Sequence, residues 1–144
     1  MSAELSATPA SGLQQLSVEE ANILAAELRS QLLQGLVPSS DTPAIERMVA
    51  GLGDTRGLMR LTFAESLGAV GAAAVPLLLR VVGGDNPAQA VAAVNALAQI
   101  DDPAIERTLR DLQNQPQLDS YVRETLESAL ARIRDLHARQ PQPG

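Results

Sequence analysis

Few residues in this 144-residue chain have side chains that could do chemistry. Cysteine is absent and His137 is the only histidine, so a nucleophile–base pair and a Cys/His zinc site both lack components. Phosphate-binding glycine motifs and the H-E-x-x-H zinc motif are also missing. We therefore predict no catalytic residue, no metal site and no nucleotide cofactor. His137 most simply complements the C-terminus of a last helix or faces water.

The acidic residues that come in pairs fit structural roles. Asp101 and Asp102 directly precede Pro103, which is a favoured residue in the first turn of a helix. Capping of that helix explains them better than acid–base catalysis does. Glu106 and Arg110 are four residues apart, which is the spacing of an exposed ion pair on one helix.

A repeated pentapeptide predicts two of the helices that position these residues. PAIER occurs at residues 43–47 and again at 103–107. In the first copy the apolar residues Ile45, Val49 and Leu52 follow the i, i+4, i+7 spacing of one helix face. The second copy repeats this spacing, so both copies predict a helix that opens on proline.

A second kind of helix lies between these copies. The segments ESLGAVG (65–71), NALAQID (95–101) and SALARIR (128–134) align without gaps, at offsets of 30 and 33 residues. A leucine occupies the same place in each segment, at Leu67, Leu97 and Leu130. A period near thirty residues is typical of stacked helical hairpins, in which neighbouring units complete one another's core.

These patterns predict an all-α domain with a leading helix and three helical pairs. Ser17 and Glu20 form the S-x-x-E pattern of a capping box for the leading helix, which Gly35 can end. The predicted pairs are residues 43–53 with 56–70, 73–83 with 87–100, and 103–114 with 119–138. We expect loose tails at 1–16 and 139–144, a helical repeat domain at 17–138, and no strand.

Composition narrows the class of protein. Apolar residues make up 45% of the chain, but only Phe63 and Tyr121 are aromatic. The formal net charge of −6 disfavours nucleic acid as a partner. We expect no apolar run that approaches the ~20 residues of a membrane span, and the start does not resemble a signal peptide. We expect a soluble cytoplasmic protein.

Candidate binding residues follow from the phase of the second helix type. With the three leucines facing the core at 100° per residue, equivalent positions form polar rows on the opposite face. Arg60 and Arg123 point nearer the core, where they either tie turn carbonyls or contact a ligand. The partner-binding candidates are Arg60, Thr62, Glu65, Asn95, Gln99, Arg123, Ser128 and Arg132, and the wider row includes Ala69, Ala92 and Thr125.

The segment 53–79 resembles a short-unit HEAT repeat, with its Gly53-Asp54 turn, the apolar-Arg pair Met59-Arg60, and Leu67-Gly68. More narrowly, RLTFAESLG followed by AVPLLL, and NALAQIDDP at 95–103, resemble cyanobacterial HEAT-repeat proteins of phycobilisome biology. That group includes the E/F-type bilin lyases and the phycobilisome degradation protein. The resemblance implies an α-α solenoid.

The same resemblance implies a phycobiliprotein or phycobilisome component as partner, handled during bilin attachment, chaperoning or turnover. A phycobilin ligand is implied by resemblance only; Arg60 and Arg123 would then meet its propionates, beside Phe63 and Tyr121 as an aromatic wall. The sequence therefore favours a protein-binding module. A generic protein–protein scaffold and a small bilin lyase or detachase remain as alternatives.

Overall fold

The computed structural model of the chain describes residues 15–139, apart from the side chains of residues 137 and 139. The predictions for most of the two tails and for the His137 side chain therefore lie outside the described residues. Within residues 15–139 the structure is helical and contains no strand, as predicted. The helices are α2 (Val18–Leu33), α3 (Thr42–Gly51), α4 (Gly57–Val70), α5 (Val75–Val82), α6 (Pro87–Ala98), α7 (Ala104–Gln113) and α8 (Ser120–Arg139), with a 3₁₀ turn η1 (Gly71–Ala74) before α5.

The helix starts form where the sequence places capping side chains. The Ser17 hydroxyl accepts a hydrogen bond from the Glu20 N–H at 3.0 Å, and the Glu20 carboxylate accepts one from the Ser17 N–H at 2.9 Å. The Asp41 carboxylate caps α3 by accepting from the Ala44 N–H at 2.9 Å. At α7 the N-cap position is Pro103, and the carboxylate of Asp102, one residue earlier, accepts from the Ala104 N–H at 2.9 Å.

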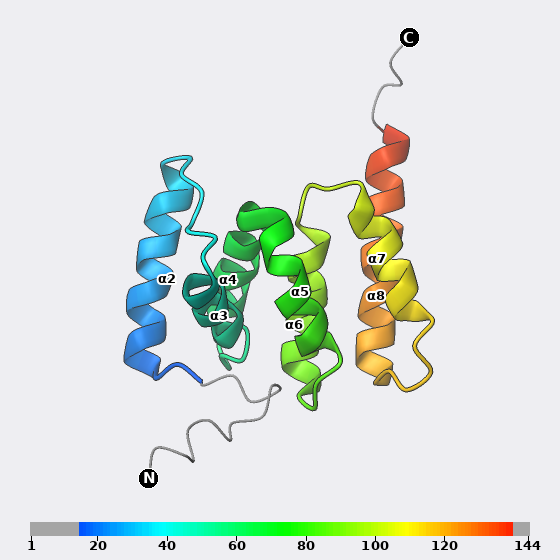
Figure 1. Ribbon diagram of the computed structural model, residues 1–144, viewed down its shortest axis with the longest axis horizontal. Coiled ribbons are helices and arrows are strands. Elements are labelled where there is room, and N and C mark those ends of the chain that lie inside the picture. Colours follow the sequence, from blue (N-terminus) through cyan, green and yellow to red (C-terminus); the bar gives the residue numbers. More distant parts are fainter. Residues whose placement is uncertain (1–14, 140–144) are drawn as a thin grey trace.

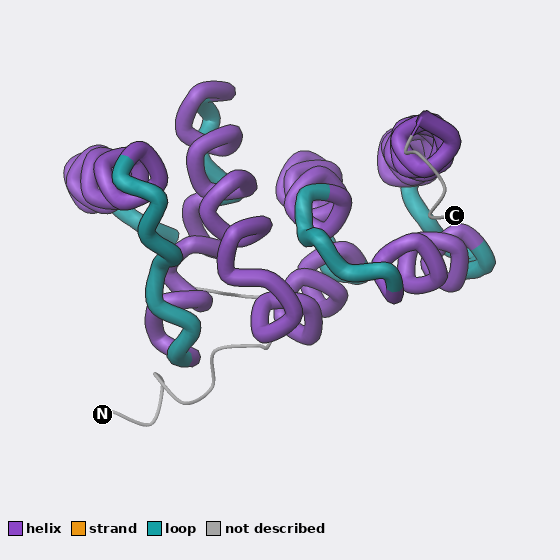
Figure 2. The backbone as a smooth tube through the Cα atoms, turned by 90° about the horizontal axis from the view of Figure 1, so that it is seen from above, coloured by secondary structure: helices purple, strands orange, loops and turns teal. Residues whose placement is uncertain are grey.

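The helices lie in two layers (Figure 1). Helices α2, α4, α6 and α8 contact one another in succession and form the inner layer. Helices α3, α5 and α7 pack against α4, α6 and α8 respectively and form the outer layer. Figure 2, seen from above, shows the two rows of helices. The predicted pairing of helices is therefore observed.

The core lies between the two layers and follows the predicted leucine rows. Leu67 and Leu97 are fully buried and Leu130 is 2% exposed. The small residues before them, Ser66, Ala96 and Ala129, are also completely buried and let the outer helices approach closely. Phe63 is fully buried too, because Gly51 leaves room for its ring: a Cβ at Gly51 would lie only 2.4 Å from Phe63 Cδ2.

One sequence-based expectation needs correction. The stretch Gly57–Val82 is long and apolar enough to cross a membrane by length and composition, with a mean hydropathy of 1.6. In the structure this stretch is not one α-helix. Helix α4 ends at Gly71, whose φ is 86°, and η1 and α5 follow. Its core-facing side chains, such as Leu67 and Leu78, are fully buried by the neighbouring helices. Core helices meet the same length and composition criteria, so the stretch carries no argument for a membrane.

Candidate functional site

A groove runs along the inner layer between α4, α6 and α8, and its volume is about 1520 Å³. Its floor consists mainly of small side chains, among them Ala64, Ala92 and Ala129, which leave space between the helices. Larger apolar side chains line its walls. Leu61, Tyr121 and Leu136 are exposed to solvent, and Val91 and Ile133 are partly buried.

A glycine fixes the approach of α4 to α6 beside the groove. A Cβ at Gly68 would lie 2.8 Å from Gln99 Cβ and 3.1 Å from the Gln99 carbonyl oxygen. Only glycine therefore allows α4 to pack this closely against the C-terminal end of α6. This contact holds Gln99 at the groove, where its amide donates to the Asn95 carbonyl oxygen at 3.5 Å.

Arg60 lies at the end of the groove where α4 begins, and it also has a structural contact. Its guanidinium donates a hydrogen bond to the Asp54 carbonyl oxygen at 2.8 Å, which ties α4 to the turn before it. Of the two roles predicted for Arg60, the hydrogen bond to a turn carbonyl is therefore observed. Arg60 also lines the groove, so the same side chain faces any occupant of that end.

Arg123 performs the equivalent task in the last helical pair. Its guanidinium donates to the carbonyl oxygens of Gln113 at 3.1 Å and Gln115 at 3.2 Å, and so fastens the α7–α8 loop. Arg123 is not among the residues that line the groove. Arg123 therefore holds the α7–α8 loop and does not line the candidate site.

An ion pair in the α3–α4 turn positions the start of α4. The Asp54 carboxylate accepts hydrogen bonds from Arg56 Nε at 2.9 Å and from Arg56 Nη2 at 2.8 Å. Arg56 also donates to the Asn22 side chain at 2.7 Å and so connects this turn to α2. The hydrogen bonds from the Arg56 side chain lower the pKa of Asp54, and the same bonds raise the pKa of Arg56.

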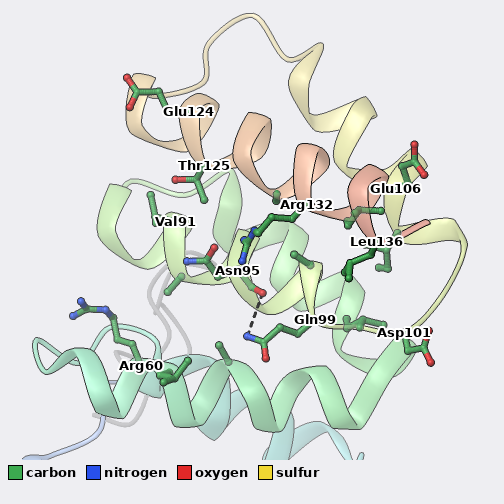
Figure 3. A pocket seen from close by; sticks show the side chains of 18 of the residues that line it. Arg60, Val91, Asn95, Gln99, Asp101, Glu106, Glu124, Thr125, Arg132 and Leu136 are labelled. Atoms are coloured by element: carbon green, nitrogen blue, oxygen red, sulfur yellow. Dashed lines mark hydrogen bonds between the residues drawn. The ribbon is translucent and has the colours of Figure 1, made fainter. Parts of the chain in front are cut away.

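Arg132 lies in the middle of the groove. In Figure 3 its side chain extends from α8 toward Asn95 on α6. Arg132 makes no hydrogen bond or ion pair with any residue that the structure describes. It therefore presents a free guanidinium to an occupant of the groove. The predicted candidates that line the groove are Arg60, Asn95, Gln99 and Arg132.

Besides Arg123, three predicted candidates lie outside the groove. Thr62 was placed on the open face, but it is only 6% exposed: its hydroxyl donates to the Leu58 carbonyl oxygen and accepts from Arg29 of α2. The prediction was wrong because α2 packs on the side of α4 that was taken to be open. Helix α4 lies between α2 and α6, so the Thr62 side chain is covered by α2. Glu65 and Ser128 are exposed, but neither lines the groove.

The predicted aromatic wall for a pigment is also corrected. Phe63 is fully buried in the core and cannot contact a ligand. Tyr121 lines the groove and is 69% exposed. Leu61 and Leu136 also line the groove and were not predicted from the sequence. Both are large apolar residues outside the core-facing stripe of their helices, and this position could have indicated them.

Charged side chains are distributed unevenly along the groove (Figure 3). Asp101, Asp102 and Glu106 lie where α6 ends and α7 begins, and Glu124 lies near the start of α8. Glu106 pairs with Arg110, as predicted, and Asp102 accepts a hydrogen bond from the Ala104 N–H at the start of α7. Asp101 is exposed and has no partner among the described residues. With Arg60 and Arg132 as the lining cations, the groove carries more negative than positive groups.

No family model matches the chain. No solved structure matches it significantly. The chain is 52% identical over 66 residues to the bilin biosynthesis protein MpeU of Synechococcus sp. (strain WH8020). It is 35% identical over 107 residues to the uncharacterized phycocyanin operon protein Z of Pseudanabaena tenuis (strain PCC 7409).

The aligned regions are partial. The first match covers 46% of this chain and 22% of the Synechococcus protein. The second covers 71% of this chain and 53% of the Pseudanabaena protein. The chain thus spans about a fifth of one curated relative and about half of the other. It is similar to cyanobacterial proteins whose names refer to bilin biosynthesis and to the phycocyanin operon.

Proposed function

We propose that the chain is a protein-binding module that acts in the cytoplasm on a phycobiliprotein or another phycobilisome component. The observation that carries this proposal is the groove of about 1520 Å³ on the inner layer, whose walls expose large apolar side chains. Exposed apolar surface of this kind marks a binding site for another molecule. The similarity to a bilin biosynthesis protein and to a phycocyanin operon protein supports the class of partner.

The fold that we propose for the module is a HEAT-like α-α solenoid. Successive helical pairs bury equivalent leucines, at Leu67, Leu97 and Leu130. Arg60 and Arg123, at matching places in the first and last pairs, both donate to carbonyl oxygens of the preceding loop. Repeated contacts of this kind support a stack of similar units, in which the inner helices line one continuous surface.

The biochemical step that we propose is handling of the phycobiliprotein during bilin attachment, chaperoning or turnover. No side chain that lines the groove forms a nucleophile–base pair, so the groove offers binding chemistry. A generic scaffold without any pigment connection is the plain alternative.

A small bilin lyase or detachase is a second candidate, favoured by the 52% identity to the bilin biosynthesis protein. In that case Arg60 and Arg132, the two arginines that line the groove, would bind the propionates of the pigment, and Tyr121 would lie against its rings. Arg123 and Phe63 would take no part, because one fastens a loop and the other is buried.

Mixing the purified chain with holo- and apo-phycocyanin separates these functions. Co-migration on size exclusion with an unchanged absorption spectrum supports the binding module. A shifted spectrum, or pigment transferred between proteins, supports the lyase or detachase. If neither form co-migrates and the spectrum stays unchanged, the phycobiliprotein function is wrong and the scaffold remains.

A further inference from the structure

The size of the groove indicates what kind of occupant it takes. Its volume of about 1520 Å³ exceeds the ~300–1,000 Å³ of pockets that hold small molecules. The groove follows the whole of α6, whose 12 residues span roughly 18 Å at a rise of about 1.5 Å per residue. That length matches a helix of about three turns in a partner protein.

The walls of the groove have the apolar surface that an amphipathic helix needs. Leu61 on α4 is 49% exposed, and Tyr121 and Leu136 on α8 are 69% and 59% exposed. Tyr121 lies in the first turn of α8, and Leu136 lies four turns later, near its end. Apolar side chains at helical spacing on a partner could therefore meet apolar side chains along the full length of the groove.

The charged side chains of the groove indicate how a bound helix is oriented along it. Asp101, Asp102 and Glu106 lie at one end of the groove, beside the C-terminus of α6. Asp102 accepts a hydrogen bond from the Ala104 N–H at the start of α7, and Glu106 pairs with Arg110. Asp101 is exposed and has no partner among the described residues, so it is the carboxylate at this end that can attract a cation. Arg132, in the middle of the groove, has no partner among the described residues and attracts an anion.

We propose that the groove binds an amphipathic helix of the partner that carries Lys or Arg at the end lying over Asp101. An acidic side chain near the middle of that helix faces Arg132, and its apolar stripe packs on Leu61, Tyr121 and Leu136. This inference rests on the proposed function for the identity of the partner. The recognition of a basic-ended helix rests on the groove itself.

The test uses the full chain and fluorescein-labelled peptides of about 15 residues, the length of a four-turn helix. The peptides overlap and cover both subunits of phycocyanin, and binding is followed by fluorescence anisotropy. We expect the bound peptides to share an apolar helical stripe with a basic residue at one end. Intact phycocyanin is measured in parallel.

Two charge reversals have matched controls in the chain. Asp101→Lys changes an exposed groove residue, and Asp111→Lys makes the same change on the exposed surface of α7. Arg132→Glu changes the groove, and Arg134→Glu changes the same helix outside it. We expect each groove variant to weaken binding about fivefold or more, and each control to stay within about twofold.

A charge swap distinguishes direct contact from indirect damage. A peptide whose basic end residue is replaced by Glu should bind the Asp101→Lys variant better than it binds the original chain. Loss of binding without this recovery would overturn the predicted contact at Asp101.

The remaining outcomes separate the inference from the proposed function. If peptides bind with the predicted charge dependence but intact phycocyanin does not, the groove inference stands and the proposed partner is wrong. If phycocyanin binds but no peptide does, or if phycocyanin binds and both groove variants behave like their controls, the inference is overturned and the proposed function stands. If neither peptides nor phycocyanin bind, both are wrong.

Discussion

At the scale of single residues, three arginines hold loops in place, whereas Arg132 in the groove is available to a partner. The guanidinium groups of Arg56, Arg60 and Arg123 donate hydrogen bonds to carboxylate or carbonyl oxygens in the turns and loops before α4 and α8. Arg132, in the groove, makes no such bond to a described residue. Hydrogen bonds that satisfy loop carbonyls stabilise the helix pairs, whereas an arginine without a partner is available for binding.

Asp54 leads to a prediction about pH. Because the Arg56 hydrogen bonds lower the pKa of Asp54 in the folded chain, the carboxylate stabilises the fold above its unfolded pKa. This stability is lost as the pH falls through the folded pKa, below the usual value of 3.8. We expect Asp54→Ala to lower the free energy of unfolding at pH 7 by about 1–2 kcal/mol, which is at the low end for a hydrogen bond to a charged group because the Arg56 side chain is 40% exposed.

Urea unfolding at a series of pH values checks this expectation. The difference between Asp54→Ala and the original chain should shrink as the pH drops below about 4. Asp85→Ala is the control, because Asp85 is exposed and makes no interaction with a described residue. A destabilisation by Asp54→Ala that does not change with pH would show that the carboxylate charge has no role.

At the scale of elements, the contact between α4 and α6 depends on Gly68. A methyl group there would lie 2.8 Å from Gln99 Cβ and 3.1 Å from a backbone oxygen, which cannot rotate away. We expect Gly68→Ala to lower the free energy of unfolding by about 1–3 kcal/mol, as overpacking does. Thermal unfolding followed by circular dichroism measures the loss.

Gly57→Ala provides the matched control on the same helix. Its Cβ would lie 3.8 Å from the nearest side-chain atom, Arg60 Nη2, which is ordinary contact. Since alanine is also the better helix former, this change should leave stability unchanged or slightly raised. Equal losses in both variants would mean that α4 and α6 do not pack as the structure has them.

Leu97 tests the core beneath the groove. It is fully buried in the middle helical pair, so Leu97→Ala should cost about 2–5 kcal/mol of unfolding free energy. Gln99, two residues later, is exposed, and Gln99→Ala should cost less than ~0.5 kcal/mol. Urea denaturation of both variants gives the comparison. Similar costs at the two positions would contradict the orientation of α6.

Helix positions could be predicted from the sequence because local signals mark them. The capping box at Ser17, the repeated PAIER and the aligned leucines all depend on residues near one another in the chain. The faces of the helices were harder to predict. Thr62 is buried because α2 packs on α4 from the other side, and that contact joins residues far apart in sequence.

At the scale of the whole molecule, the two layers give the protein two different surfaces. The outer layer consists of α3, α5 and α7, and the inner layer carries the groove (Figure 2). The sequence predicted that the inner helices form the binding face, and Asn95, Gln99 and Arg132 do line the groove. Its apolar walls were not predicted, because their exposure depends on how far apart α4, α6 and α8 lie.

The central claim is that the inner layer, and not the outer one, binds the partner. Amide hydrogen exchange of the full chain, measured by mass spectrometry with and without apo-phycocyanin, tests it most directly. We predict that binding slows exchange in α6 and in the segment of α8 around Arg132, and leaves α3 and α5, which do not line the groove, unchanged. Slower exchange confined to α3 or α5, with α6 and α8 unaffected, would contradict the account.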